Sequence, residues 1–312
     1  MKRTFLLLSV VFSTQLLFGQ IERLARETDE RFNFYITADV GRNGYYQQKP
    51  IAEKMGEIAE TVDIEFITSL GDIHHFDGIQ SVDDPLWMTN FELVYSHPEL
   101  MIEWFSILGN HEYQGNIEAF FDYSKVSRRW RAEEPYYTQL HELKDGSTLR
   151  LLYIDTPPMI DKYRQDTIKY RAVATQDMQK QLKWIESVLK DNKATWTVVM
   201  GHHPVLAQTP KNPTERTDLQ KRLAPMMRKY KVDFYINGHI HNFQHITEKE
   251  SEINYIVNSS GSLSREVSPI EGTQFCSNQA GFSIFSVDEN SAKIYFLNQN
   301  GDILHTVIKE RK

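Results

Sequence analysis

Five short apolar segments of this chain each end at a residue whose side chain can bind a metal ion. The segments FNFYITAD, EFITSLGD, WFSILGN, WTVVMGH and FYINGH end at Asp39, Asp72, Asn110, His202 and His239. Each is typical of a buried strand, since four to eight mostly apolar residues followed by a turn suit a sheet covered on both faces. Open α/β sheets bind their ligands at the carboxyl ends of strands, so these side chains are expected to converge. Carboxylate, amide and imidazole ligands suit cations such as Fe, Mn or Zn, and the pattern predicts a binuclear metal site.

The segments that position these residues alternate between strands and helices, and the end of the chain is rich in strands. Strands are predicted at 32–38, 64–70, 104–108, 135–142, 149–155, 195–200, 232–237, 253–257, 282–287, 292–297 and 303–308. Helices are predicted at 50–61, 85–95, 116–126, 176–190 and 217–230, with Thr175 as the N-cap of the fourth. This order predicts an α/β fold in which two mixed sheets pack as a sandwich. Helices are expected on the outer faces, and the metal site at the carboxyl ends of the strands.

The composition is that of a globular protein. Of its 312 residues, 40% are hydrophobic and 25% are charged, both ordinary fractions. We find no linker, internal repeat or low-complexity tract, so residues 20–312 are expected to form one domain. The protein is also expected to be a monomer. The single cysteine, Cys276, permits no intramolecular disulfide.

The first 19 residues have the order of a secretory signal. Lys2 and Arg3 precede an apolar stretch from Phe5 to Phe18, which ends at the small residue Gly19. Cleavage there would place the protein in a periplasm or outside the cell, with no membrane span, although a buried helix or an uncleaved anchor is the alternative. Removal of residues 1–19 would leave 33 basic residues against 42 acidic ones, a formal charge of −9. That acidic balance argues against binding to nucleic acid.

Five ordered motifs carry a resemblance to a known family. They are D-x-G at 39–41, GDxxH at 71–75, GNHE at 109–112, GHH at 201–203 and GHIH at 238–241. The chain resembles the calcineurin-like metallophosphoesterase superfamily, and within it the small purple, tartrate-resistant acid phosphatases. The resemblance extends over about residues 32–285 and includes SLGDIHHFDGI and FELVYSHPEL. It implies a metal-dependent phosphatase in which an activated water attacks phosphorus directly.

The resemblance also implies a set of metal ligands arranged around Asp72, whose two carboxylate oxygens would bridge two cations. The other ligands would be Asp39 and His241 for one metal, and Asn110, His202 and His239 for the second. Two such metals can clamp a phosphoryl oxygen and lower the pKa of a water molecule.

The substrate is expected to lie against the same residues. Asp72 and His111 are the expected catalytic residues, with His111 protonating the leaving group or holding the phosphate. Asn110, His111 and His202 are the expected contacts of the phosphate.

One departure from the family concerns the first metal. The purple enzymes have a tyrosinate three residues after the bridging Asp, where this chain has His75, and many other members have a histidine where this chain has Gly41. His75 is therefore either a neutral ligand of the first metal or not a ligand. Two divalent ions with Asp39, Asp72 and a hydroxide leave a net charge of about +1, and a trivalent ion would raise it to about +2. We therefore hypothesise two divalent ions, no purple colour and an activity optimum near neutral pH.

A second departure is Lys211, at the position of a histidine that the purple enzymes place near the substrate. Lys211 either contacts phosphate as a point charge or is a solvated loop residue. Arg42, just after Asp39, either reaches a phosphate oxygen or is likewise solvated.

The pattern favours an exported phosphomonoesterase acting on a small phosphate ester. A phosphodiesterase or nucleotidase on the same fold is the nearest alternative, because the metal motifs are shared among them. A non-catalytic phosphate- or metal-binding protein is the alternative from another class. Loops 73–85 and 156–174 are expected to shape the leaving-group pocket.

Overall fold

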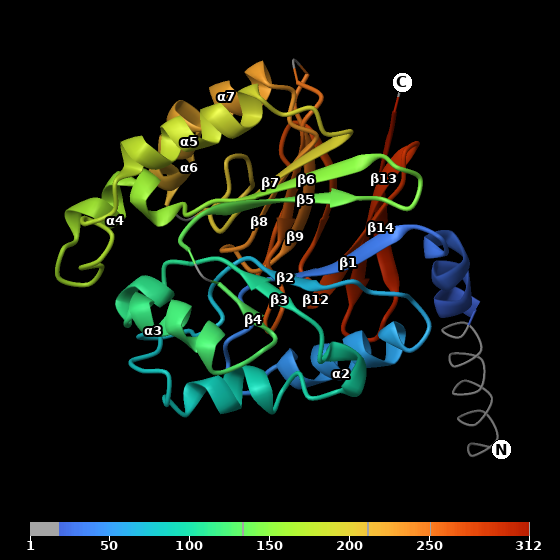
Figure 1. The fold of residues 1–312 in the computed structure, drawn as a ribbon, viewed down its shortest axis with the longest axis horizontal. Coiled ribbons are helices and arrows are strands. Elements are labelled where there is room, and N and C mark those ends of the chain that lie inside the picture. Colours follow the sequence, from blue (N-terminus) through green and yellow to red (C-terminus); the bar gives the residue numbers. More distant parts are fainter. Residues whose placement is uncertain (1–18, 133, 211, 250, 312) are drawn as a thin grey trace.

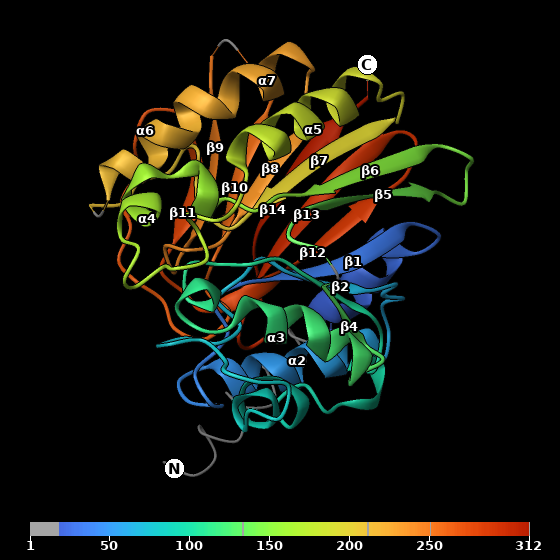
Figure 2. The ribbon, with the colours of Figure 1, turned by 60° about the vertical axis from the view of Figure 1, so that its left-hand side comes forward.

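Two seven-stranded sheets lie face to face at the centre of the protein, as the computed structural model shows (Figures 1 and 2). The structure describes residues 19–132, 134–210, 212–249 and 251–311, so residues 1–18 of the predicted export signal and Lys211 lie outside it. One sheet has the order β14-β13-β12-β1-β2-β3-β4, and the other has the order β11-β9-β10-β8-β7-β6-β5. The predicted fold of two packed mixed sheets is confirmed.

The first sheet joins a parallel half to an antiparallel half. Its strands are β1 (Phe32–Thr37), β2 (Ile67–Ser69), β3 (Trp104–Ser106), β4 (Trp130–Arg131), β12 (Gly281–Val287), β13 (Ser291–Asn298) and β14 (Ile303–Glu310). Strands β1 to β4 are parallel, and β12 pairs antiparallel with β1. The carboxyl ends of β1, β2 and β3 therefore lie at one edge of the sheet.

The second sheet has the same mixed character. Its strands are β5 (Tyr137–Glu142), β6 (Thr148–Tyr153), β7 (Trp196–Gly201), β8 (Phe234–Asn237), β9 (Phe243–Thr247), β10 (Asn254–Asn258) and β11 (Thr273–Ser277). Strands β6, β7, β8, β10 and β11 run in the same direction, while β5 and β9 run against them. The carboxyl ends of β7 and β8 thus lie side by side.

Helices cover the outer faces of both sheets (Figure 2). They are α2 (Gln48–Ala59), α3 (Ile117–Asp122), α4 (Asp161–Gln165), α5 (Met178–Lys190), α6 (Pro213–Arg222) and α7 (Ala224–Lys229). Helices α2 and α3 lie below the first sheet, and α5, α6 and α7 lie over the second. Among the described residues, none of the helices has both the length and the apolar character needed to cross a membrane.

Aromatic side chains fill the space between the two sheets. Phe34 of β1 stacks on Phe66 and on Phe285 of β12, with ring centroids 4.8 and 4.9 Å apart. Phe285 meets Phe234 of β8 edge to face at 5.4 Å, and all four side chains are buried. Such contacts join the two sheets because each aromatic ring buries a large apolar area. These aromatic contacts fix the position of the strand ends of one sheet relative to those of the other.

Several predicted elements differ from the observed ones. The helix expected at 85–95 is centred on a short π-helix, Met88–Glu92, and the helix expected at 217–230 is divided into α6 and α7. The division falls before Pro225, which has no backbone N–H to continue the first helix. The N-cap of α5 is Asp177, whose carboxylate accepts the N–H of Lys180 at 2.9 Å, so the prediction of Thr175 is wrong. Strands β4, β9 and β11 were not predicted.

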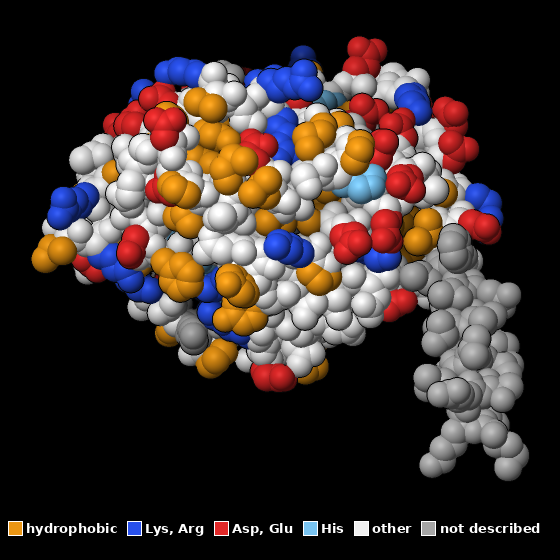
Figure 3. All heavy atoms as spheres, turned by 90° about the horizontal axis from the view of Figure 1, so that it is seen from below, with side chains coloured by type: hydrophobic (Ala, Val, Ile, Leu, Met, Phe, Trp, Pro, Cys, Tyr) orange, Lys and Arg blue, Asp and Glu red, His pale blue; other side chains and the backbone are white. Residues whose placement is uncertain are grey.

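The surface is mixed in character. Figure 3 shows the face seen from below, where Lys and Arg, Asp and Glu, and hydrophobic side chains are interspersed. This agrees with the moderate formal charge of −7 for the whole chain.

Candidate metal centre

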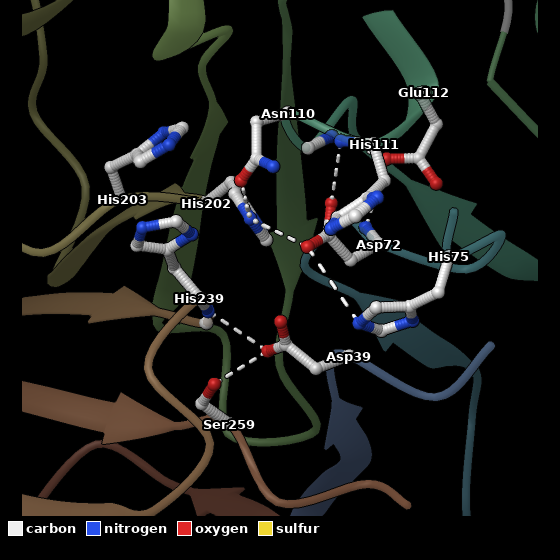
Figure 4. Close-up of polar contacts among 12 residues, drawn as sticks. Asp39, Asp72, His75, Asn110, His111, Glu112, His202, His203, His239 and Ser259 are labelled. Carbon is white, nitrogen blue, oxygen red and sulfur yellow. Dashed lines mark hydrogen bonds and ion pairs between the residues drawn. The ribbon is translucent and has the colours of Figure 1, made fainter. Parts of the chain in front are cut away.

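The loops that follow β1, β2, β3, β7 and β8 bring their side chains together at the carboxyl ends of these strands (Figure 4). Their side chains form overlapping groups in which the possible ligand atoms all lie within 4.8 Å of one another. One group is Asp39, Asp72 and His202, a second is Asp39, His75 and His241, and a third is His202, His203 and His239. The structure therefore brings together residues that are up to 202 positions apart in the sequence.

Asp72 lies at the centre of these groups. Its Oδ2 is 3.3 Å from Nε2 of His202 and 3.9 Å from Nε2 of His75, and its Oδ1 accepts the backbone N–H of His111 at 3.0 Å. The carboxylate thus has histidines on two sides, as Figure 4 shows. This is the position that a bridging ligand requires.

The ring of His202 has a fixed orientation. Its Nδ1 lies 2.7 Å from the backbone oxygen of Leu70, which can only accept, so Nδ1 carries the proton. The other nitrogen, Nε2, points toward Asp72 and lies 3.2 Å from Oδ1 of Asn110. A backbone carbonyl behind a histidine is the usual way in which a metal-binding imidazole is oriented.

Four of these residues have left-handed backbone conformations, which are rare for residues other than glycine. The φ angles are 57° for Asp39, 54° for Asp72, 81° for His239 and 56° for His241. Each such residue costs roughly 1–2 kcal/mol, and strain of this kind is concentrated at functional sites. Oδ2 of Asp39 helps to hold the loops together, since it accepts the N–H of His239 at 2.8 Å and the hydroxyl of Ser259 at 2.5 Å.

Gly41 and His75 explain how the first half of the centre departs from a D-x-H motif. A Cβ atom on Gly41 would lie 2.1 Å from the backbone oxygen of Ile73, so a histidine does not fit there. His75 instead brings an imidazole close to Asp39 and His241, and its ring centroid is 5.5 Å from that of His241. The chain therefore has a nitrogen ligand available from the second motif rather than from the first.

Several of these buried polar atoms have no hydrogen-bond partner among the described residues. They are Oδ1 of Asp39, Nδ1 and Nε2 of His75, and Nδ1 of His241. Buried polar atoms are nearly always paired, so such a concentration calls for an explanation. Cations bound between these atoms would satisfy them, and the residues fit a metal centre.

His239 has a carboxylate partner that the sequence did not reveal. Its Nε2 lies 3.0 Å from Oε2 of Glu215, a buried residue in the first turn of α6. The other oxygen of Glu215 accepts the hydroxyl of Tyr163 at 2.7 Å and the ammonium of Lys162 at 2.9 Å. Glu215 therefore fixes the ring of His239 and leaves Nδ1 as the nitrogen for a metal.

Glu112 joins the second and third motifs. Its buried carboxylate accepts the backbone N–H groups of Asp72 at 2.9 Å, Gly109 at 2.7 Å and His74 at 3.1 Å. Burial and the nearby Asp72 charge raise its pKa, while these donors oppose the rise. A Cβ on Gly109 would lie 2.2 Å from Oδ1 of Asp72, so only glycine permits this approach.

His111 stands at the edge of the centre rather than inside it. Its Nδ1 donates to the backbone oxygen of Phe76 at 2.7 Å, which leaves Nε2 free for another partner. A ring nitrogen of His111 also lies within 4.8 Å of ligand atoms of Asp72 and His75. His111 is thus placed to contact a molecule bound at the centre without being needed as a ligand.

The two remaining motif histidines are buried and have protein partners. Nδ1 of His74 lies 3.2 Å from Nδ2 of Asn90, and the ring packs against Trp87. His203 lies between Thr156, 2.8 Å from its Nδ1, and Tyr163, 3.0 Å from its Nε2.

Burial and neighbouring charges shift the pKa values of several groups in the centre. Burial raises the pKa of Asp39 to about 7, an effect that the charge of His202 partly offsets. Burial works against protonation of His202, but the Asp72 carboxylate outweighs it and raises the pKa of His202 to about 10. Burial lowers the pKa of His75 to about 3. At neutral pH, His75 is therefore neutral, and one of its ring nitrogens offers a lone pair.

Comparison with known proteins agrees with this geometry. Residues 32–243 match the calcineurin-like phosphoesterase family. The chain belongs to this family. It is 30% identical to purple acid phosphatase 3 of Arabidopsis thaliana over 312 residues, which cover 96% of this chain and 83% of that protein. It is 31% identical to human tartrate-resistant acid phosphatase type 5 over 215 residues, covering 66% of this chain and 65% of that one.

Solved structures share the calcineurin-like phosphoesterase fold. GAP50, described as the anchor in the inner membrane complex of Plasmodium, superposes with a TM-score of 0.76 at 21% identity, over 90% of this chain and 89% of GAP50. The purple acid phosphatase PPD1 of yellow lupin superposes with a TM-score of 0.62 at 15% identity, over 90% and 54% of the two chains. The predicted relation to purple and tartrate-resistant acid phosphatases is confirmed, and the chain is a metallophosphoesterase.

Proposed function

We propose that this metallophosphoesterase hydrolyses phosphomonoesters by direct transfer of the phosphoryl group to water, without a phosphorylated enzyme residue. The observation that supports this most directly is the buried cluster of unpartnered ligand atoms with His111 at its edge. The family relatives named as acid phosphatases support the same reaction class. The substrate is a small phosphate ester.

The ligand groups suit two divalent cations, chosen from Fe, Mn and Zn. Asp39, His75 and His241 would hold one of them, and Asn110, His202 and His239 would hold the second, with Asp72 between the two. When bound, such a pair supplies Lewis acidity, which polarises a phosphoryl oxygen and makes water a better nucleophile at neutral pH. With His75 neutral, two divalent ions leave less uncompensated charge than a mixed-valence pair does.

His111 provides the acid for the leaving group. Its Nδ1 proton is committed to Phe76, and its backbone N–H is committed to Asp72. Only Nε2 is left to donate to the oxygen of the departing alcohol, and a positioned histidine acid contributes typically about 10²–10⁴-fold to the rate. A leaving alcohol needs such a proton because an alkoxide is a poor leaving group in water.

The protein acts outside the cytoplasm as a monomer in this proposal. Support comes from the basic, apolar and small-residue order of residues 1–19, which is typical of an export signal. Mass spectrometry of the protein from its native host should find an N-terminus after Gly19. Native mass spectrometry of the same protein should give the mass of a single chain. An intact Met1 in the exported fraction would contradict cleavage.

The reaction class is tested with two chromogenic esters, p-nitrophenyl phosphate and bis-p-nitrophenyl phosphate. Protein stripped with a chelator and reloaded with Mn, Zn or Fe should favour the monoester in kcat/KM. A preference for the diester would change the function to that of a phosphodiesterase. Two bound metals with no turnover of either ester would instead indicate a binding protein.

A further inference from the structure

Two guanidinium groups lie beside the Asp39 half of the centre without a carboxylate partner. Within the described residues, the side chains of Arg42 and Arg265 make no hydrogen bond and no ion pair. Nε of Arg42 is also shielded from solvent, which makes its lack of a partner costly. An unpaired cation at the edge of a phosphoesterase site points to an anion supplied by a ligand.

The loop after β1 holds Arg42 close to the catalytic histidine. The backbone N–H of Arg42 donates to Oε1 of Gln48 at 3.2 Å, and its guanidinium carbon lies 5.6 Å from the ring centroid of Phe76. Phe76 is also the residue whose carbonyl accepts the bond from His111. Phe76 is 62% exposed, so its apolar side chain lies open to solvent beside the Arg42 guanidinium.

Arg265 reaches the same region from the other sheet. Its backbone N–H donates to the carbonyl oxygen of His241 at 2.6 Å, and its side chain is exposed. Both guanidinium groups lie near His241, since the charges of Arg265 and Arg42 both interact with this residue. The adjacent Glu266 accepts a hydrogen bond from Asn278 at 2.9 Å and is engaged there.

We propose that Arg42 and Arg265 form a subsite for a second anionic group of the substrate, next to the phosphoryl group that is transferred. The subsite rests on the proposed phosphomonoesterase function and defines its substrate class as esters whose leaving group carries a carboxylate or a further phosphate. Arginine suits both anions because its guanidinium stays charged and donates in a planar fork. The ring of Phe76 provides a surface for the carbon skeleton between the two anionic groups.

Three aryl phosphates test the subsite. 4-Carboxyphenyl phosphate carries the second anion, 4-carbamoylphenyl phosphate is its neutral counterpart of similar size, and 1,4-phenylene bisphosphate shows whether phosphate is preferred to carboxylate. The natural protein should prefer the anionic esters to the neutral one by roughly tenfold in kcat/KM. Arg42→Gln and Arg265→Gln should each reduce this ratio toward one, while Arg26→Gln, an exposed change on the helical segment 19–28, should keep it.

The outcomes separate the subsite from the reaction itself. Equal kcat/KM for all three esters in the natural protein, or a ratio that survives both arginine changes, overturns the subsite. Absence of turnover with every ester contradicts the phosphomonoesterase function instead. Because the side chain of Arg265 is exposed, Arg265→Gln gives a result even if Arg42→Gln fails to fold.

Discussion

His75 and Asp72 face each other across 3.9 Å, measured from Nε2 of the imidazole to Oδ2 of the carboxylate. The histidine is buried, and neither of its ring nitrogens has a hydrogen-bond partner among the described residues. This pair places a neutral nitrogen where purple acid phosphatases have a tyrosinate. The difference bears on both metal charge and colour.

His75→Tyr should make the protein purple. A tyrosinate at this position can bind a ferric ion, so the variant loaded with Fe(III) should show a broad visible absorption band that the natural protein lacks. Phe76→Tyr is the matched control, because it adds a phenol one residue away, on a side chain that is 62% exposed. A strong visible absorption band in the active natural protein would contradict the hypothesis of two divalent ions.

His111→Ala should separate catalysis from metal binding. The imidazole has Nδ1 bonded to Phe76 and is not required as a ligand, so the variant should retain two metals per chain. Its kcat for an alkyl phosphate such as glycerol phosphate should fall by about 10²–10⁴-fold, because the departing alkoxide needs the proton. Metal analysis and steady-state kinetics on the same sample make the comparison. Loss of metal together with activity would show that His111 is a ligand, and unchanged kcat would remove it from the mechanism.

Glu215→Gln should weaken metal binding through His239. The carboxylate lies 3.0 Å from Nε2 of His239, and loss of such a partner typically lowers metal affinity by about 10–100-fold. Titration against a competing chelator measures the affinity. Glu186→Gln serves as the control, since that carboxylate pairs with Lys229 on the surface. Equal affinities in both variants would mean that Glu215 has only a packing role.

Much of this centre was predictable from the sequence because the relevant signals are local. Asp72 and His202 follow apolar segments that could only be buried strands, and glycines mark the turns beside them. Glu215 was missed because the helix was expected to begin at 217, although Pro213 suits a first helical turn. Arg265 was missed because only folding brings it next to His241.

The elements that were not predicted have similarly weak local signals. Strand β4 contains two residues, Trp130 and Arg131, and pairs only because β3 lies beside it. Strand β11 has a register shift near Thr273, so its side chains do not alternate regularly. These segments form strands because they pair with other strands in the folded protein, and the local sequence pattern does not indicate that pairing.

Asp155→Asn should change the pH dependence of folding stability. Burial raises the pKa of Asp155 to about 8, and the hydrogen bond from Tyr113 opposes this rise. Because the unfolded pKa is about 3.9, the folded state binds the extra proton, and stability is lost as pH rises from about 4 to about 8. The difference in Tm between the variant and the natural protein should therefore shift in favour of the variant as the pH rises from 5 to 8. Asp63→Asn, which alters an exposed carboxylate, should show no such trend.

Stepwise metal loading of chelator-stripped protein is the most direct test of the proposed centre. Hydrolysis of p-nitrophenyl phosphate and bound metal should be followed together as Mn²⁺ or Zn²⁺ is added. Turnover should be absent at the start and should rise until about two ions are bound per chain. Full turnover in the stripped protein, or a plateau of activity at one ion per chain, would contradict a binuclear phosphomonoesterase.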